Sequence, residues 1–395
     1  MRCPQRIGCG IPGRISAEDG GRYRDSPESF RGYSAVVIHR FAHKFVITLT
    51  RSLSILKVVF VCLCAISGAF AQETPAPAPS IVFKAHDADA IRDYKTNPAV
   101  VRAMVNRLVL AVTGKSDVAE AWRSLVTPND KIGIKISAAG GELFTTHHDV
   151  VNAVVDGLVA AGHARDTIIV WDRSIAGAKE AGYSKADGYQ LKAIAPRDGY
   201  DRKAIVTGPV IGQLVWGDLE YVPSTKSPVL DDTENSSNVS HVARILSSEV
   251  TKVINVPVMS SSETNGIAGC LYNMTVPNID NWRRFTQSIG FGRESLAELY
   301  IEPLLGKKVV LNIMDGLVAQ YAGGPQSQPN WAVHFATLYA SKDPVAIDAI
   351  ALKQLQQWRA AGSLPAIEHT ADYIKAATLI GLGNSERIEV RNVAR

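Results

Sequence analysis

Cysteine is scarce in the part of the sequence that has the composition of a folded domain. The chain has 395 residues and five cysteines, and four of these precede residue 65. Only Cys270 follows them, and a single thiol can form neither an intramolecular disulfide nor the ligand set of an iron–sulfur cluster. We therefore expect no iron–sulfur cluster, and we interpret Cys270 as a small buried hydrophobic residue.

The sequence also lacks the motifs of several common protein classes. No Walker motif and no Gly-x-Gly-x-x-Gly follows a predicted strand, and no Gly-x-Ser-x-Gly elbow occurs. The first two absences argue against the usual nucleotide-binding loops, and the third leaves a serine hydrolase without support. The formal net charge of +4 comes with no long basic run, so nucleic acid is not an expected partner.

The N-terminal residues differ in composition from the rest. Residues 1–50 are rich in Arg, Gly, Ser and Pro without periodicity, and we interpret them as disordered or as a mis-assigned start. Residues 51–71 place an apolar run after Arg51 and Lys57 and end on Ala-Phe-Ala, which is typical of a signal peptide. The expected location is periplasmic or secreted. The alternative is an uncleaved membrane anchor, with the protein facing outside the cytoplasm.

Residues 131–174 show the pattern of strand, glycine-containing loop, helix and strand. Isoleucines alternate with other residues over 132–136, which predicts a strand. Valine and leucine recur at helical spacing over 150–159, with Thr146 as the predicted N-cap and Gly162 as the predicted end. The apolar run that closes on Asp172 is typical of a parallel strand buried on both faces.

The same alternation predicts the fold class. After a Pro/Ala linker at 72–84, residues 85–395 predict one α/β domain, a mostly parallel sheet with flanking helices in three layers. The polar segment 187–238 is predicted to form a cap or subdomain. The remaining predicted helices are 85–113, 117–125, 176–183, 241–250, one that begins near residue 266 after the loop from 260, 294–305, 344–362 and 370–383, and the remaining strands are 251–259, 307–316, 334–341 and 385–393.

Three charged residues lie in or directly after predicted strands. Right-handed crossovers bring the carboxyl ends of parallel strands to one edge, so Lys135, Asp172 and Asp315 are expected in a common crevice. We predict Asp172, Asp315 and Lys135 as catalytic residues. The two aspartates are acid–base groups or ligands of a divalent cation, and Lys135 is the partner of an anion or of their charge. The alternative is that each aspartate caps a turn or a helix.

Other polar residues are predicted to bind a ligand at the same edge. The loop 260–265 offers amides and hydroxyls for an anionic group, or N-caps as the alternative. His147 and His148 would point about 100° apart on a helix, so both cannot easily face one metal. We prefer His147 as the functional residue, and the alternative is a plain surface or capping histidine. Asp343 precedes Pro344 and also suits an N-cap. The predicted ligand-binding residues are Thr145, Thr146, His147, Arg173, Ser262, Glu263, Asn265, Asn273 and Asp343.

Three stretches together resemble a bacterial and archaeal family called domain of unknown function 362. The first combines Lys135 at a strand end, Thr145-Thr146-His147 at a helix start, and Asp172 at the next strand end. The second is 255–274, with Asn-x-Pro and Gly-x-x-Gly-x-x-x-Asn, and the third runs from Ile313-Met314-Asp315-Gly316 through Gly324-Pro325 to residue 348. The likeness covers most of residues 130–352.

The second stretch departs from the family pattern. Members often carry Lys and His in the loop and Lys before the helix Asn, where this chain has Val258, Ser260, Ser262 and Tyr272. Several positive charges are therefore missing from the expected crevice. The resemblance implies no settled activity, and the cysteine clusters of the iron–sulfur-associated members are absent from this sequence.

These residues together predict an exported protein of uncharacterised activity. We interpret it as an enzyme acting on a small polar or anionic ligand at the carboxyl-terminal edge of the parallel sheet. The alternative is an extracytoplasmic ligand-binding or scaffold protein without catalysis. Contact with a membrane is expected only through an uncleaved N-terminal segment.

Overall fold

A computed structural model describes residues 78–194, 196–221, 235–286 and 295–394. The predicted signal peptide, the segment before it and residues 72–77 of the predicted linker lie outside these ranges. Residues 77–395 form one unit. No helix in the described part of this unit is both long and apolar enough to cross a membrane.

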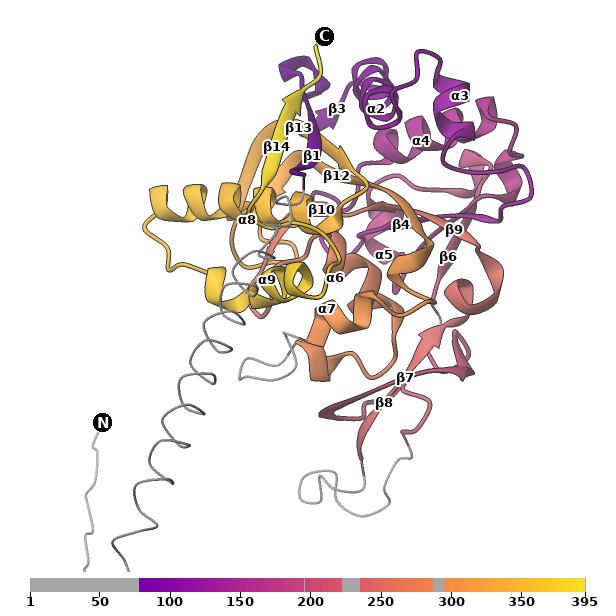
Figure 1. The fold of residues 1–395 in the computed structure, drawn as a ribbon, viewed down its shortest axis with the longest axis vertical. Coiled ribbons are helices and arrows are strands. Elements are labelled where there is room, and N and C mark those ends of the chain that lie inside the picture. Colours follow the sequence, from indigo (N-terminus) through magenta and orange to yellow (C-terminus); the bar gives the residue numbers. More distant parts are fainter. Residues whose placement is uncertain (1–77, 195, 222–234, 287–294, 395) are drawn as a thin grey trace, which may run out of the picture. The chain divides into compact units, whose positions relative to one another are not determined.

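A ten-stranded sheet forms the centre of this unit (Figure 1). Across the sheet the strands are β14 (Ile388–Asn392), β1 (Ser80–His86), β13 (Ala332–Ser341), β12 (Val309–Gln320), β9 (Lys252–Val256), β4 (Ile132–Ile136), β5 (Ile169–Asp172) and β6 (Gln190–Ala193), with β10 (Val258–Ser262) and β11 (Gly266–Ile267) off this path. From β12 to β6 all neighbours run parallel, whereas β13 runs antiparallel to β12 and β1. The sheet is therefore mostly parallel, as the sequence predicts.

Helices cover both faces of the sheet. One face carries α2 (Pro98–Thr113), α3 (Val118–Arg123) and α4 (His148–Ala160), and the other carries α6 (Cys270–Thr275), α7 (Ser295–Tyr300), α8 (Pro344–Ala361) and α9 (Asp372–Leu379). Ile132, Ile134 and Ile136 belong to the core on the α2–α4 face, while Lys135 points to the α6 face. This alternation follows from the two-residue period of a strand. The α/β class predicted from the sequence is confirmed.

A separate hairpin lies outside the main sheet. It pairs β7 (Tyr200–Gln213) with β8 (Ser236–Ala243), and residues 222–234 between them lie outside the described ranges. Within the segment predicted as a cap or subdomain, β6 joins the main sheet and α5 (Ala176–Glu180) precedes the segment. The hairpin is held by Arg284, whose guanidinium donates to carbonyls of both strands.

The structure corrects several predicted boundaries. Residues 85–97, predicted as the start of a helix, contain the end of β1 and the small pair β2 (Ile91–Arg92) and β3 (Lys95–Thr96). β1 also takes residues 80–84 of the predicted linker. Residues 241–250 contain the end of β8 and a π-helix at Ile245–Glu249 instead of an α-helix. β1 pairs only with strands far along the chain, which a local pattern does not reveal.

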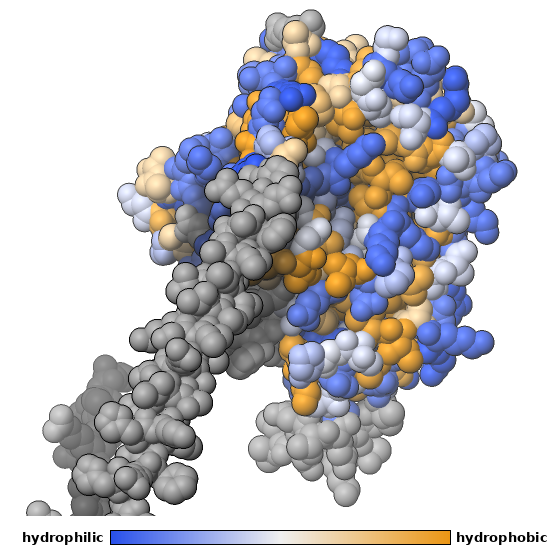
Figure 2. Space-filling model, viewed as in Figure 1, coloured by the Kyte–Doolittle hydropathy of each residue, from blue (hydrophilic) through white to orange (hydrophobic). Residues whose placement is uncertain are grey.

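Hydrophobic side chains reach the surface in several places. Figure 2 shows hydrophobic areas broken up by hydrophilic side chains on the face that it displays. The most exposed large hydrophobic side chains are Leu379 at 87%, Trp216 at 72% and Ile211 at 64%. They come from α9, the turn after β7 and β7 itself, so they belong to separate elements.

Candidate functional site

A row of buried polar side chains crosses the sheet beneath α6. Lys135 pairs with Asn255, Asn255 with Asn312, and Asn312 with Ser341, so these residues stand at one level of four neighbouring strands. Asn255 Nδ2 donates to Asn312 Oδ1 over 2.9 Å. Asn273 of α6 completes the row, because its Nδ2 donates to Asn255 Oδ1 over 2.9 Å. Mutual hydrogen bonding avoids the free-energy cost of burying unpaired amides.

Lys135 ends this row and binds Asp172. The ammonium is fully buried and donates to Asp172 Oδ1 over 2.7 Å, to Asn273 Oδ1 over 3.0 Å and to the Ile136 carbonyl over 2.7 Å. These acceptors use all of its donors. Burial lowers the pKa of Lys135, against the opposing effect of the Asp172 charge and hydrogen bond. Lys135 therefore fixes Asp172 but does not reach a ligand, which makes it a positioning residue and not a catalytic one.

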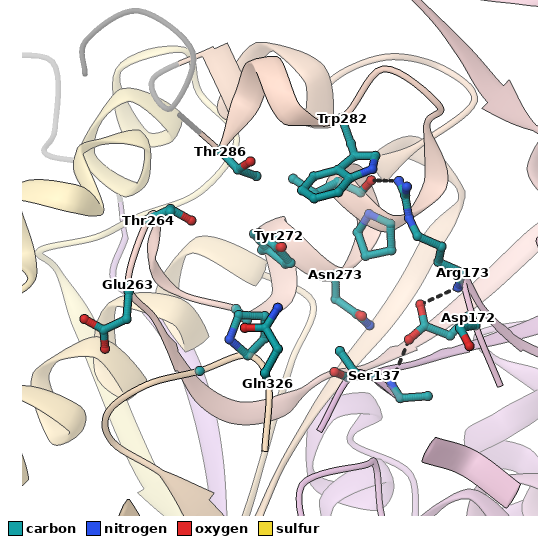
Figure 3. Close-up of a pocket in the computed structure, with 18 of the residues that line it drawn as sticks. Ser137, Asp172, Arg173, Glu263, Thr264, Tyr272, Asn273, Trp282, Thr286 and Gln326 are labelled. Atoms are coloured by element: carbon teal, nitrogen blue, oxygen red, sulfur yellow. Dashed lines mark hydrogen bonds between the residues drawn. The ribbon is translucent and has the colours of Figure 1, made fainter. Parts of the chain in front are cut away.

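Asp172 is the member of the pair that opens to the outside. It is 5% exposed. Its Oδ2 accepts from the Ala138 amide over 2.7 Å, and its Oδ1 also accepts from the Arg173 amide over 2.7 Å (Figure 3). A carboxylate offers about four acceptor positions, so about one is left for a ligand after these bonds and that from Lys135.

Asp172 lies on the floor of a cavity of about 650 Å³, which we call the Asp172 cavity. This volume lies in the range of small-molecule sites. The cavity lies beyond the carboxyl ends of β4, β5, β10 and β12, the edge at which parallel sheets usually bind ligands. In Figure 3, Tyr272 lies between the Asp172–Arg173 side and the Glu263–Thr264 side. The other residues that line the Asp172 cavity include Ser137, Ser174, Asn273, Pro277, Trp282, Arg283, Thr286 and Gln326.

Two arginines flank the same tryptophan in one wall. The Arg173 guanidinium lies 5.0 Å from the centre of the Trp282 ring, and the Arg283 guanidinium lies 5.5 Å from it. Arg173 is also committed to the fold, because its Nη2 donates to the carbonyls of Val276 and Ile279 over 2.7 and 2.5 Å. Arg283 is exposed and carries a positive charge at the cavity. This wall favours an anionic group on a ligand.

Tyr272 adds a hydrogen-bond donor to the cavity. Burial raises the pKa of its hydroxyl to about 12, with the opposing effect of Arg173 and a further increase from Asp172. The hydroxyl is therefore protonated at neutral pH. It has no hydrogen-bond partner within the described residues and lines the cavity, so it is available to a ligand. In the family pattern this position often carries a lysine, and here the donor is neutral.

The loop after β10 is divided between the cavity and the fold. Glu263 lines the cavity, and its Oε1 accepts from the Gly323 amide over 2.7 Å and from Arg359 Nη1 over 3.3 Å. Ser262 and Asn265 are fully buried, with Ser262 Oγ accepting from the Asn265 amide over 3.2 Å. Of the three residues predicted from this loop, only Glu263 reaches the cavity.

The two threonines before α4 fix the loop after β4. Thr146 Oγ1 accepts from the Ser137 amide over 2.9 Å and donates to the Val256 carbonyl over 2.7 Å. The N-cap of α4 is His147, so the prediction that Thr146 is the N-cap is wrong. Thr145 Oγ1 donates to the Gly141 carbonyl over 2.6 Å. Thr146 is fully buried and therefore supports the loop instead of facing a ligand.

Asp315 lies outside the Asp172 cavity. It is fully buried, and its Oδ2 accepts from the backbone amide and from Nδ1 of His147 over 2.7 and 2.8 Å. A divalent cation at Asp172 or Asp315 would compete with the Lys135 ammonium or the His147 ring for the carboxylate. Throughout the described ranges, His, Cys, Asp and Glu side chains form no group of three or more suited to a metal ion. The structure brings Lys135 and Asp172 together and gives Asp315 a separate partner.

Asp343 is occupied as a helix cap. Its Oδ1 accepts from the Ala346 amide over 3.0 Å at the start of α8. Its Oδ2 accepts from Ser80 Oγ over 2.5 Å and from the Asn384 amide over 2.9 Å. These bonds join the start of α8 to the first residue of β1 and to the loop before β14, so the structure favours the N-cap alternative over ligand binding.

Several cavity residues were not predicted from the sequence. Trp282, Arg283 and Thr286 belong to a short 3₁₀ turn and its end, and the segment 323–326 is irregular. Such segments have no periodicity that would place them. The one local signal is Asn-Trp-Arg-Arg at 281–284, which joins an aromatic residue to two cationic ones in a region with little other regular pattern.

A comparison with protein-family models confirms the resemblance seen in the sequence. The model of a family described as "Domain of unknown function (DUF362)" matches residues 131–353. A crystal structure of a protein from Thermotoga maritima is similar with 12% sequence identity and a TM-score of 0.37. That match covers 69% of this chain and 61% of the other, so the chain spans less than two thirds of that protein. No curated protein matches the sequence.

Proposed function

The chain belongs to the DUF362 family, and we propose that it binds a small polar or anionic ligand in the Asp172 cavity and acts on it as an enzyme. One observation carries this proposal. A nearly buried carboxylate, fixed by Lys135, lies on the floor of a cavity whose wall carries the exposed charge of Arg283. Buried charges held at fixed positions in a cavity are typical of functional sites.

The proposed chemistry assigns a different role to each polar group. Asp172 accepts or returns a proton of the ligand, because it is the ionisable group that reaches the cavity floor. Lys135 positions Asp172 from below, and Tyr272 donates a hydrogen bond from the cavity wall. Arg283 holds an anionic group at the opposite end of the ligand.

The second candidate function is ligand binding without catalysis. It is favoured by the bonds that Asp172 already accepts from Lys135, Ala138 and Arg173, which hold it rigidly. The Asp172→Asn variant separates the two functions. An enzyme should lose turnover while it keeps affinity, whereas a binding protein has only affinity to lose.

The Arg283→Gln variant tests whether the ligand is anionic. Equilibrium dialysis of the purified protein against a mixture of small carboxylates, phosphate esters and neutral sugars, followed by mass spectrometry, identifies what is bound. We expect the unchanged protein to enrich one or more anions, and Arg283→Gln to weaken that binding about tenfold through loss of a charge-assisted hydrogen bond. Arg202→Gln, at an exposed arginine of β7, is the control. Equal enrichment by all three proteins would contradict the proposal.

We also propose that the protein is exported. The support is the signal-peptide pattern of residues 51–71. N-terminal sequencing of the protein from cell fractions should find a chain that begins after Ala71 in the periplasm or the medium. An intact N terminus in the membrane fraction would support the anchor, and an intact N terminus in the cytoplasm would contradict export.

A further inference from the structure

The pair formed by His147 and Asp315 has the arrangement of a proton-accepting site. Asp315 is fully buried, and its Oδ1 accepts from the Leu317 amide over 3.1 Å while its Oδ2 binds the amide and Nδ1 of His147. A carboxylate bound in this way holds the proton of the histidine on Nδ1 and leaves the lone pair on Nε2. The orientation of the His147 ring is fixed, because the backbone amide and the ring Nδ1 of His147 bind the same oxygen, Asp315 Oδ2.

The free nitrogen of His147 faces a second cavity. This cavity has a volume of about 710 Å³ and is lined by His147, which keeps 12% of its side chain exposed. His147 Nε2 has no hydrogen-bond partner within the described ranges. It is also absent from the fully buried polar atoms that lack a partner there, so Nε2 keeps some accessible surface. Nε2 is therefore the ring nitrogen that is open to the cavity.

His148 differs from His147 although both residues line the cavity. Its Nε2 lies 2.9 Å from Asp187 Oδ1, and its ring packs 4.9 Å from the ring of Tyr183. These contacts hold the His148 side chain in the fold.

The pKa of His147 is raised above its ordinary value of 6.5. Burial lowers this pKa, but the charge and hydrogen bond of Asp315 outweigh the effect of burial. A raised pKa makes Nε2 a stronger proton acceptor than an ordinary histidine.

The second cavity is separate from the Asp172 cavity. The two share no lining residue. The loop after β4 contributes residues 137–139 to the Asp172 cavity, and the chain that follows contributes Glu142, Leu143, Thr145, His147 and His148 to the second cavity. Likewise, Gln326 lines the first and Ser327 the second. These two segments form a partition between the cavities.

The charges around the second cavity favour a ligand without negative charge. Glu142 and Glu180 are exposed acidic residues at its wall, against one exposed base, Lys95. The positive end of the α4 dipole is already offset by Asp315, which binds the N-cap amide, and by Asp149 in the first turn. Tyr94 adds an exposed aromatic ring, which can contact an organic cation.

From this geometry we propose that the second cavity is a ligand site for a small hydroxyl-bearing organic cation, whose hydroxyl donates its proton toward His147 Nε2. This site is independent of the function proposed for the Asp172 cavity, because it uses other residues and the opposite ligand charge. Asp315 is its positioning residue. The sequence predicts His147 and Asp315 in one crevice with Asp172. In the structure they belong to the second cavity instead.

Chemical protection of His147 tests the proposal without changing that residue. Diethyl pyrocarbonate acylates an unprotonated imidazole: Nε2 attacks a carbonyl carbon, a C–O bond breaks, and the ring loses its Nδ1 proton. The ethyl carbonate released takes up a proton and decomposes to ethanol and carbon dioxide. Peptide mass spectrometry then gives the acylation rate of His147 in the full-length protein. We expect choline at about four times its dissociation constant to slow this rate about fivefold. Isethionate, which has the same hydroxyethyl group and a negative charge, should give no protection.

Acidic variants provide the matched comparison. In Glu142→Gln/Glu180→Gln the choline concentration needed for half-protection should rise about tenfold, since each exposed charge contributes modestly. Glu386→Gln, an exposed acidic residue in the loop before β14, should leave it unchanged. The proposal is overturned if His147 is not acylated, if isethionate protects as well as choline, or if the double variant is protected like the unchanged protein.

Discussion

Replacing Lys135 with methionine is expected to lower the free energy of unfolding by about 3–5 kcal/mol, because a buried ion pair loses one partner. The Lys135 ammonium is fully buried and lies 2.7 Å from Asp172 Oδ1. Methionine fills a similar volume but offers no donor, so the carboxylate of Asp172 and the amide oxygen of Asn273 lose a hydrogen bond beneath the cavity. Urea unfolding, followed by circular dichroism, measures the change.

Two further variants make this prediction specific to the pair. Lys131→Met replaces an exposed lysine just before β4 and should change stability by no more than about 0.5 kcal/mol. The double variant Lys135→Met/Asp172→Asn should lose less free energy of unfolding than the two single variants together, because without the carboxylate no buried charge is left unpaired. Simple additivity, or a Lys135→Met variant as stable as Lys131→Met, would show that the pair does not hold the cavity floor.

Replacing Arg284 with methionine is expected to lower the free energy of unfolding by roughly 2–6 kcal/mol, at about 1–3 kcal/mol for each of the two buried acceptors left unpaired, the Val206 carbonyl and Ser240 Oγ. The guanidinium is fully buried and donates to the carbonyls of Val206, Val210 and Asn238 and to Ser240 Oγ. No carboxylate pairs with it within the described ranges. Burial lowers its pKa to about 10, against the opposing effect of Asp280 and Glu220.

The same change should also loosen the wall of the Asp172 cavity. Arg284 directly follows Arg283, and its hydrogen bonds tie the 282–286 segment to β7 and β8. Hydrogen exchange of the hairpin amides should therefore accelerate more than that of β4 and β9. Arg284→Lys should lose less stability, since a lysine keeps the charge but not the planar set of donors. Arg202→Met, at an exposed position of β7, is the control. If the hairpin amides of Arg284→Met are as protected from exchange as those of the unchanged protein, this role of Arg284 is contradicted.

The sequence predicts the central unit well because its pattern is local. The two-residue period of 132–136 and the helical spacing of 150–159 are strong, and the structure has a strand and a helix there. The pairing of Lys135 with Asp172 follows from the same pattern, because a parallel crossover of ordinary length places both at one edge. The family pattern also includes both residues.

The sequence predicts less where distant partners decide the outcome. The helix predicted over 85–113 begins only at Pro98, because β1 pairs with β13 and β14 from the far end of the chain. Asp315 ends up with His147 and not with Asp172, a choice that depends on which way the side chain points and not on the edge to which it belongs. The cavity wall at 282–286 has no periodicity from which it could be placed.

Buried and exposed charged residues have different roles in the structure. Lys135, Asp315 and Arg284 are fully buried and fix other groups, whereas Arg283 and Glu263 reach a cavity and can meet a ligand. Asp172 lies on the floor of the first cavity with Lys135 beneath it, and His147, which is bound by Asp315, lines the second cavity.

A crystal structure of the protein soaked with the anion that it enriches most strongly tests the central claim directly. We expect electron density in the Asp172 cavity, with one polar atom of the anion within hydrogen-bond distance of Asp172 or Tyr272 and its anionic group facing Arg283. Density for that anion at another place, with the Asp172 cavity filled only by water, would contradict it.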